Sequence, residues 1–142
     1  MDDTRKIGRQ PQQAAAPAQV GPEAAQRLVA QGGYIYLDVR DADAFEEGRP
    51  AGSVNVPFSS DRGQTFVDAV RERFETDSRL VVGCNSGKRS ALAVLALARA
   101  GFTNLIECRT GWDGTRGPFG ELREPGWHRV GLPTDRGSPT HS

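Results

Sequence analysis

A chain of 142 residues and 15.3 kDa is long enough for one domain with its own core and too short for two full-sized domains. Its 18 Lys and Arg residues balance 18 Asp and Glu residues, so the chain lacks the basic surplus with which proteins bind nucleic acid or anionic membranes, and no apolar stretch approaches the ~20 residues of a membrane helix. Two cysteines are too few for a disulfide-stapled scaffold or, alone, for a structural zinc site, so no metal is expected.

The two ends of the chain lack periodic apolar positions. Residues 1–19 are rich in Gln, Ala and Pro and predict a disordered leader, because they offer too little apolar surface to offset the entropy of ordering. No apolar run follows the basic residues of this leader, so a secretory signal is not indicated and the default location is cytoplasmic. Residues 134–142 are rich in Gly, Pro, Ser and Thr and predict a flexible tail. The folded domain is therefore expected over residues 20–133.

Between these ends, helical and strand-like patterns alternate, which indicates an α/β fold. The patterns predict helices over residues 22–31, 41–47, 66–74 and 90–100, and strands over 34–39, 53–56, 80–82 and 105–106. The run of Leu80, Val81 and Val82 is typical of a central parallel strand covered on both faces. We therefore predict a small, mostly parallel sheet flanked by helices on both faces. The Gly-rich stretch from Thr110 to Gly126 predicts a long irregular loop.

The turn between the strand at 80–82 and the next helix carries a thiol and two cations. It reads Gly83, Cys84, Asn85, Ser86, Gly87, Lys88, Arg89. Sites in α/β folds form at the carboxyl ends of strands, and a helix N-terminus together with nearby cations stabilises a thiolate. Cys84 is therefore the candidate nucleophile. The two glycines enclose three residues where a Walker A loop needs four, and neither Ser nor Thr follows Lys88, so a nucleotide-binding loop is excluded.

Four segments give the chain a family resemblance. The loop CNSGKRS, the segment YLDVRD, the stretch FEEGRPAGSVNVPF and the closing GWHRVGLP resemble the single-domain rhodanese (thiosulfate sulfurtransferase-like) family, over roughly residues 20–133. The resemblance implies a small α/β fold in which Cys84 takes sulfane sulfur from thiosulfate or a similar small anion. The resulting persulfide passes its sulfur to a thiophilic acceptor such as cyanide or a thiol. Neither a metal nor an organic cofactor is implied.

The same resemblance assigns roles within the active loop. From Cys84 to Arg89 the loop has six residues, as in the sulfur-transferring members, whereas related phosphatases use one residue more. The residues expected to bind substrate are Asn85, Ser86, Gly87, Lys88, Arg89 and Ser90. Lys88 or Arg89 would pair with the departing sulfite. Asp38 and Arg40 match a supporting Asp-Val-Arg segment, in which Asp38 is expected to fix the loop by hydrogen bonds. Arg40 is expected either to pair internally or to orient substrate.

The chain departs from the family pattern at three places. Arg49 replaces a common His, which either adds positive charge near the mouth of the site or reflects the preference of this chain for Arg. Thr110 replaces a Gly, which suggests an altered turn. The segment 112–126 separates this turn from Trp127, and it is either a lid over the site or an insertion without a role.

Several residues and functions keep two interpretations. Cys108 is expected to pack in the core, with the alternative that it resolves an oxidised Cys84 as a disulfide. Trp112 and Trp127 are expected to be packing anchors, with Trp112 also a candidate cover for the pocket. His128 and His141 lack partners at metal-binding spacing. Besides a sulfurtransferase, the chain is compatible with a sulfur-relay or redox carrier loaded by a protein partner; a phosphatase or arsenate reductase is disfavoured by the loop length.

Overall fold

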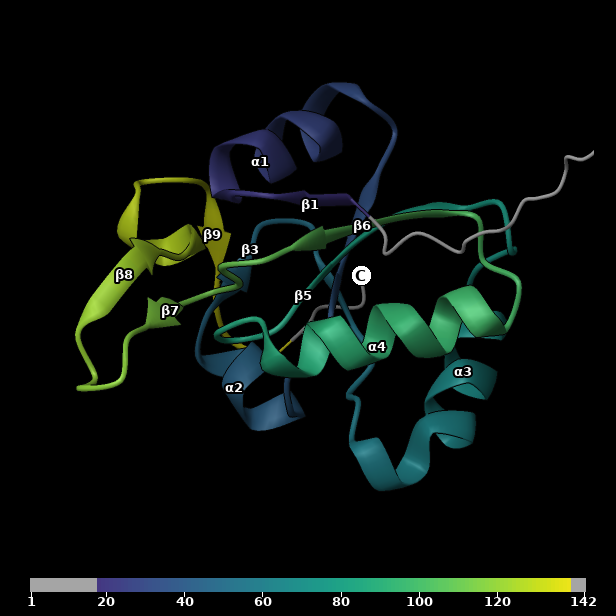
Figure 1. The fold of residues 1–142 in the computed structure, drawn as a ribbon. Coiled ribbons are helices and arrows are strands. Elements are labelled where there is room, and N and C mark those ends of the chain that lie inside the picture. The colour runs from purple at the N-terminus through teal and green to yellow at the C-terminus, as the bar shows by residue number, and fades with distance from the viewer. Residues whose placement is uncertain (1–17, 139–142) are drawn as a thin grey trace, which may run out of the picture.

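A five-stranded parallel sheet forms the centre of the protein (Figure 1). The computed structural model describes residues 18–138. Across the sheet the strands are β1 (Ala18–Val20), β6 (Asn104–Cys108), β5 (Arg79–Gly83), β2 (Ile35–Asp38) and β4 (Val54–Asn55). Every pair of neighbours is parallel. The predicted mostly parallel sheet and the central position of the 80–82 strand are therefore confirmed.

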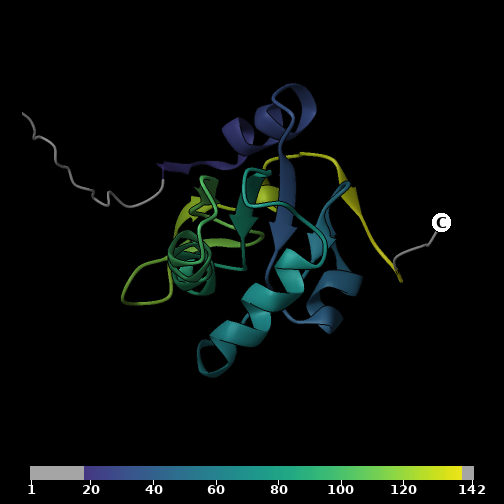
Figure 2. The same ribbon diagram turned by 90° about the vertical axis from the view of Figure 1, so that its right-hand side faces the viewer.

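Helices cover both faces of this sheet (Figures 1 and 2). The helix α1 (Pro22–Gln31) packs on one face through Ala25, in a cluster that includes Val81 and Trp127. On the opposite face lie α3 (Gly63–Arg71) and α4 (Lys88–Arg99), whose apolar side chains pack against Leu80 and Val82. Successive strand residues point to opposite faces, so the apolar run of β5 supplies both cores.

Helix α4 begins earlier than the sequence pattern predicts. Its first residue is Lys88 rather than Ser90, and Gly87 is the N-cap. The first turn of this helix therefore contains Lys88, Arg89 and Ser90, directly after the loop that carries Cys84. A short helix, α2 (Ala42–Glu47), follows β2, and a 3-10 turn at Ser60–Arg62 precedes α3.

The folded part of the chain extends past both predicted domain bounds. The prediction that residues 18–19 belong to a disordered leader is wrong, because they lie in β1, where Ala18 pairs with Ile106 and Val20 with Cys108. The assignment of residues 134–135 to the flexible tail is wrong as well, because β9 (Thr134–Asp135) pairs antiparallel with β3 (Arg49–Pro50). The remaining parts of the leader and tail, residues 1–17 and 139–142 with His141, lie outside the described residues.

The Gly-rich segment from Thr110 to Gly126 is not the irregular loop that the sequence predicts. It contains an antiparallel hairpin of β7 (Gly114–Arg116) and β8 (Leu122–Pro125). A 3-10 turn at Trp127–Arg129 follows. The Trp127 indole N–H donates a 2.7 Å hydrogen bond to the Pro133 carbonyl, and its buried ring meets Tyr36 edge to face, which confirms the packing role of Trp127. Within residues 18–138, none of the helices is long and apolar enough to cross a membrane.

Candidate active site

The loop after β5 wraps around the sulfur of Cys84. The Gly87 N–H donates to Cys84 Sγ over 3.1 Å, and Ser90 Oγ lies 3.5 Å from the same sulfur. Gly87 has a φ of +98°, and a Cβ at this position would collide with the carbonyl oxygen of Arg109. Only glycine fits here, because the residue needs both the left-handed backbone and the close approach. The first amides of α4 lack partners within the helix and point toward this loop.

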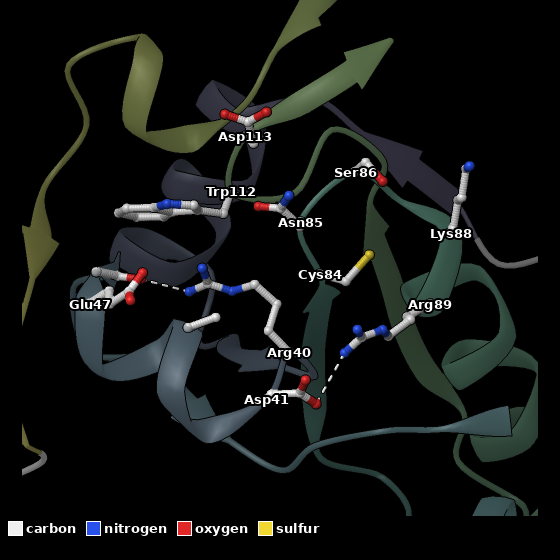
Figure 3. A pocket seen from close by; sticks show the side chains of 12 residues that line it. Arg40, Asp41, Glu47, Cys84, Asn85, Ser86, Lys88, Arg89, Trp112 and Asp113 are labelled. Carbon is white, nitrogen blue, oxygen red and sulfur yellow. Dashed lines mark hydrogen bonds and ion pairs between the residues drawn. The ribbon is translucent and has the colours of Figure 1, made fainter. Parts of the chain in front are cut away.

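Cys84 borders a cavity of about 840 Å³. The described residues that line it are Arg40, Asp41, Ala44, Glu47, Gly48, Cys84, Asn85, Ser86, Lys88, Arg89, Trp112 and Asp113. Figure 3 shows Cys84 between Arg40 and Trp112 on one side and Lys88 and Arg89 on the other. The structure thus brings the predicted loop residues together around one cavity, although Gly87 and Ser90 lie behind its wall.

The two cations of the loop have different surroundings. Arg89 forms an exposed ion pair with Asp41, with 3.3 Å between Nη1 and Oδ1. Lys88 makes no ion pair with any residue that the structure describes, and its side chain points away from Asp41 in Figure 3. Lys88 is therefore the cation whose charge is available to an anion in the cavity.

Asp38 holds Arg40 rather than the active loop. The Asp38 carboxylate accepts hydrogen bonds from the Arg40 backbone N–H and from its guanidinium, with an Nη2–Oδ2 distance of 2.7 Å. The expectation that the Asp38 side chain fixes the loop is therefore wrong. Arg40 Nη2 also donates to the Gly48 carbonyl over 2.7 Å, and its guanidinium lies 5.1 Å from the centre of the Trp112 ring. Arg40 thus pairs internally and still lines the cavity.

The start of the Gly-rich segment forms a fixed wall of the site. The Trp112 N–H donates to the Cys84 carbonyl over 2.8 Å, and the Asp113 N–H donates to the Asn85 carbonyl over 2.9 Å. The hairpin of β7 and β8 contributes no residue to the cavity lining. Trp112 therefore covers one side of the pocket, whereas the idea that the whole segment 112–126 acts as a lid stays a prediction.

The wall is strengthened by an ion cluster around Asp113. Partial burial opposes ionisation of this carboxyl, but hydrogen bonds from three side chains outweigh burial and hold the pKa of Asp113 well below its ordinary value. The donors are His128, Arg116 and Arg129. His128, for which no role was expected, thus connects Asp113 to Trp112, since its ring also packs on the Trp112 indole.

Cys108 lies on the other face of the sheet from Cys84. Cys108 is fully buried with Tyr36, Val81 and Trp127, whereas Cys84 packs in the core beneath α3 and α4. Burial raises the pKa of the Cys108 thiol, and hydrogen bonding to Thr110 offsets this only in part. Both cysteines are free. Because a disulfide requires Cβ atoms that approach each other, the structure supports the packing role of Cys108 and not the resolving role.

Several residues of the site escaped the sequence analysis. Asp41 is the N-cap of α2 and Glu47 is its last residue, and both line the cavity. A local signal was available for Asp41, because it directly follows Arg40 and is the N-cap of α2. Arg49 is buried and donates hydrogen bonds to the carbonyls of Phe45 and Gly137. It therefore connects α2 to the segment after β9 and does not add charge to the entrance of the cavity.

Within residues 18–138, no three His, Cys, Asp or Glu side chains are grouped as metal ligands.

Comparisons with known proteins agree on one family. The sequence model of the Rhodanese-like domain matches residues 21–117. Thiosulfate sulfurtransferase 16, chloroplastic, from Arabidopsis thaliana is 32% identical over 108 residues, which span 72% of this chain and 80% of that protein. Senescence-associated protein DIN1 from Raphanus sativus is 36% identical over 92 residues, or 61% of this chain and 50% of that protein. The chain therefore spans half the length of the relative from radish.

A solved structure shares the fold. The crystal structure of Rv0390 from M. tuberculosis superimposes with a TM-score of 0.70 at 25% sequence identity and covers 87% of this chain and all of that one. The predicted cytoplasmic location gains no support from the comparisons, because two of the relatives from Arabidopsis thaliana are named chloroplastic. The family match, the shared fold and the cysteine loop between β5 and α4 agree, and the chain belongs to the Rhodanese-like domain family.

Proposed function

We propose that this protein is a sulfurtransferase that carries sulfane sulfur on Cys84 as a persulfide. The observation that carries the proposal is the position of Cys84 Sγ, which receives the Gly87 N–H within the loop and borders the cavity lined by Lys88. A nucleophilic sulfur that accepts a backbone N–H and borders a cavity lined by a cation suits attack on a sulfur-containing anion. The sulfurtransferase names of the relatives support the same chemistry.

In the first step, the donor is thiosulfate or a similar anion. The Cys84 thiolate attacks the outer sulfur of thiosulfate, a bond forms between this sulfur and Sγ, and the original S–S bond breaks. The electron pair of the broken bond leaves with sulfite. Lys88 is the cation placed to offset the charge of the donor and of the departing sulfite, because Arg89 is paired with Asp41.

In the second step, an acceptor takes the outer sulfur of the persulfide. Cyanide or a thiolate attacks this sulfur, the S–S bond to Cys84 breaks, and its electron pair returns to Sγ as a thiolate. The amides of the loop would hold the negative outer sulfur until the acceptor arrives. The cavity of about 840 Å³ leaves room for an acceptor much larger than cyanide.

One observation favours a second candidate, a sulfur carrier loaded by a protein partner with little small-molecule turnover. A second cavity of about 410 Å³ shares Asp41, Lys88 and Arg89 with the first and is also lined by Phe58 and the half-exposed Leu92. An exposed apolar side chain, Leu92, beside the two loop cations suits contact with a protein partner.

Two measurements on the reduced protein separate these functions. The first is the intact mass after incubation with thiosulfate, where one added sulfur is expected in the wild type and none in Cys84→Ser. The second is steady-state turnover of thiosulfate and cyanide. Loading with rapid turnover supports the enzyme, and loading with negligible turnover supports the carrier. Cleavage of phosphate esters that depends on Cys84, without sulfur loading, would overturn both.

A further inference from the structure

A buried carboxyl group lies behind the active loop, and no step above uses it. Glu107 is on β6, where its Cα pairs with Val82 of the central strand. Its side chain is only 3% exposed. Burying a carboxylate is costly unless hydrogen bonds or a cation compensate, and an apolar residue would fill this position at a lower cost. The burial of a carboxyl group at this position therefore needs a chemical explanation.

A short chain of hydrogen bonds connects this carboxyl to the nucleophile. Cys84 Sγ lies 3.5 Å from Ser90 Oγ, and Ser90 Oγ lies 2.7 Å from Glu107 Oε2. The other carboxyl oxygen, Oε1, accepts a 2.9 Å hydrogen bond from the Gln19 amide. Ser90 is fully buried, and Cys84 is 4% exposed. These hydrogen bonds connect Cys84, which borders the cavity, through the buried Ser90 to Glu107 on the sheet.

No cation compensates Glu107 among the described residues. Of the elements that neighbour β6, β1 has no titratable side chain and β5 has only Arg79, at its opposite end. Helix α4 contributes Lys88, Arg89 and Arg99, and none of them forms an ion pair with Glu107 in the described part of the chain. Among the described residues, the side-chain hydrogen-bond partners of Glu107 are therefore Ser90 and Gln19, both uncharged, and Cys84 is reached through Ser90.

The Ser90 hydroxyl has a single hydrogen for these contacts. It is shared between the Gly87 carbonyl at 3.2 Å and Glu107 at 2.7 Å, and the shorter contact is the one to Glu107. While this hydrogen points to Glu107, Ser90 Oγ can accept the S–H of Cys84. A thiolate and a carboxylate on the two sides of one hydroxyl would leave one contact without a hydrogen and would place two like charges close together. The hydrogen-bonded series of Cys84, Ser90 and Glu107 is thus suited to hold one negative charge, not two.

We propose that Glu107 is a positioning residue that takes the proton of Cys84 through the Ser90 hydroxyl. The S–H proton passes to Ser90 Oγ as the hydroxyl proton passes to Glu107 Oε2. Thiol and carboxylate become thiolate and carboxylic acid, with no change in total charge and no added reactant. The inference rests on the proposed function only in that Cys84 is the nucleophile. It gives a buried thiol a proton acceptor inside the protein.

The test counts protons at Cys84 in the reduced full-length protein at neutral pH. The thiolate fraction is read from ultraviolet absorbance with Cys84→Ser as the blank, and the protons released on alkylation by iodoacetamide are read in a pH-stat. Without a proton store, alkylation of a thiol releases one proton and alkylation of a thiolate releases none. The thiolate fraction and the number of protons released per alkylated Cys84 then sum to one. With Glu107 as the store, alkylation removes the thiolate charge, Glu107 then ionises, and the sum rises above one toward about two.

The control is Glu107→Gln, which keeps the shape of the side chain and removes its acidity. We expect the sum to return to one in this variant. A sum of one in the wild type overturns the proposal, and so does an excess that persists in Glu107→Gln. If Glu107→Gln does not fold by circular dichroism, Ser90→Ala decides: a sum of one supports the path through Ser90, and a persisting excess overturns it. No sulfur donor is used, so a failure of sulfur transfer is distinguishable from a failure here.

Discussion

The two cysteines of this protein have similar positions in the sheet but different surroundings. Cys84 directly follows β5, and Cys108 is the last residue of β6, the neighbouring parallel strand. Both therefore lie at the carboxyl edge of the sheet, where sites of α/β proteins form. Cys84 begins the active loop and borders the large cavity, whereas Cys108 is fully buried beside Tyr36 and Trp127.

The face of the sheet explains this difference. Side chains alternate between the two faces along a strand. A position at the carboxyl edge therefore places a residue near the site, and the face to which its side chain points determines which residues it contacts. Glu107, one position before Cys108, points to the same side as Ser90 and Cys84, while Cys108 points to the core under α1. Of the two cysteines, only Cys84 faces the start of the next helix, where a thiol could act as a nucleophile.

The largest expected effect is the difference in sulfur loading between variants at the two cysteines. Cys84→Ser should abolish sulfur loading from thiosulfate, whereas Cys108→Ala should load one sulfur as the wild type does. Cys108→Ala should lower the free energy of unfolding by about 1 kcal/mol, because it removes a small buried group. Intact mass and urea unfolding measure the two effects. Loading that disappears in Cys108→Ala, in a folded protein, would contradict the separation by face.

The second prediction tests whether the shape of the active loop, rather than its cysteine alone, makes Cys84 reactive. In Gly87→Ala, the new Cβ collides with the Arg109 carbonyl at a φ of +98°, so the loop must shift, and kcat/KM for sulfur transfer should fall about 100-fold.

The matched control is Gly101→Ala. Gly101 has a φ of +99° but no atom within 4 Å of the added Cβ, and it lies at the far end of α4. This variant should lose about 1–2 kcal/mol of stability from backbone strain and keep wild-type kcat/KM. Equal losses of activity in the two variants would show that strain, not the position of the loop, is responsible.

A smaller effect is expected from the two loop cations. Lys88→Gln should raise KM for thiosulfate about 10-fold, since a hydrogen bond to a charged group is worth about 1.5 kcal/mol. Arg89→Gln should raise it less, because Arg89 is exposed and already paired with Asp41, and such pairs contribute little. Steady-state kinetics at low and high salt measure both, and the Lys88 effect should shrink with salt. The reverse order would identify Arg89 as the anion-binding residue.

Much of the fold could be predicted because strong local signals mark its elements. Apolar runs define β2 and β5, and Gly32, Gly48 and Gly101 follow three of the helices. The strands β1 and β9 could not be predicted, because each has two or three mostly exposed residues and forms only by pairing with a distant segment. Their pairing is a tertiary property that no local pattern records.

The candidate site was predictable where chemistry and loop position coincide, as at Cys84. It was not predictable where a residue acts through distant partners. Arg49 resembles any other Arg in a chain with many, yet its guanidinium bonds the carbonyls of Phe45 and Gly137. Glu107 resembles a surface charge beside Leu105 and Ile106, and only the neighbouring helix shows that it is buried. Its one local signal is a carboxyl inside an apolar strand next to the centre of the sheet.

The smallest expected effect is a pH dependence of stability that belongs to Cys108 alone. Burial raises the pKa of this thiol in the folded protein, so as pH rises the unfolded chain loses the proton first. The free energy of unfolding should therefore fall above about pH 8.5, with a slope of at most about 1.4 kcal/mol per pH unit. Urea unfolding of Cys84→Ser between about pH 7 and pH 10 isolates the effect from the other thiol.

In Cys84→Ser combined with Cys108→Ala, the part of the slope below the titration range of tyrosine should disappear. Tyr36, whose pKa is raised mainly by burial, acts in the same direction at higher pH and remains in both proteins. Equal slopes with and without the Cys108 thiol would mean that this sulfur ionises as easily in the fold as in the open chain. Burial in the core would then leave the ionisation of Cys108 unchanged. That result would contradict the expected effect of burial, which removes water from the charged form and so opposes ionisation.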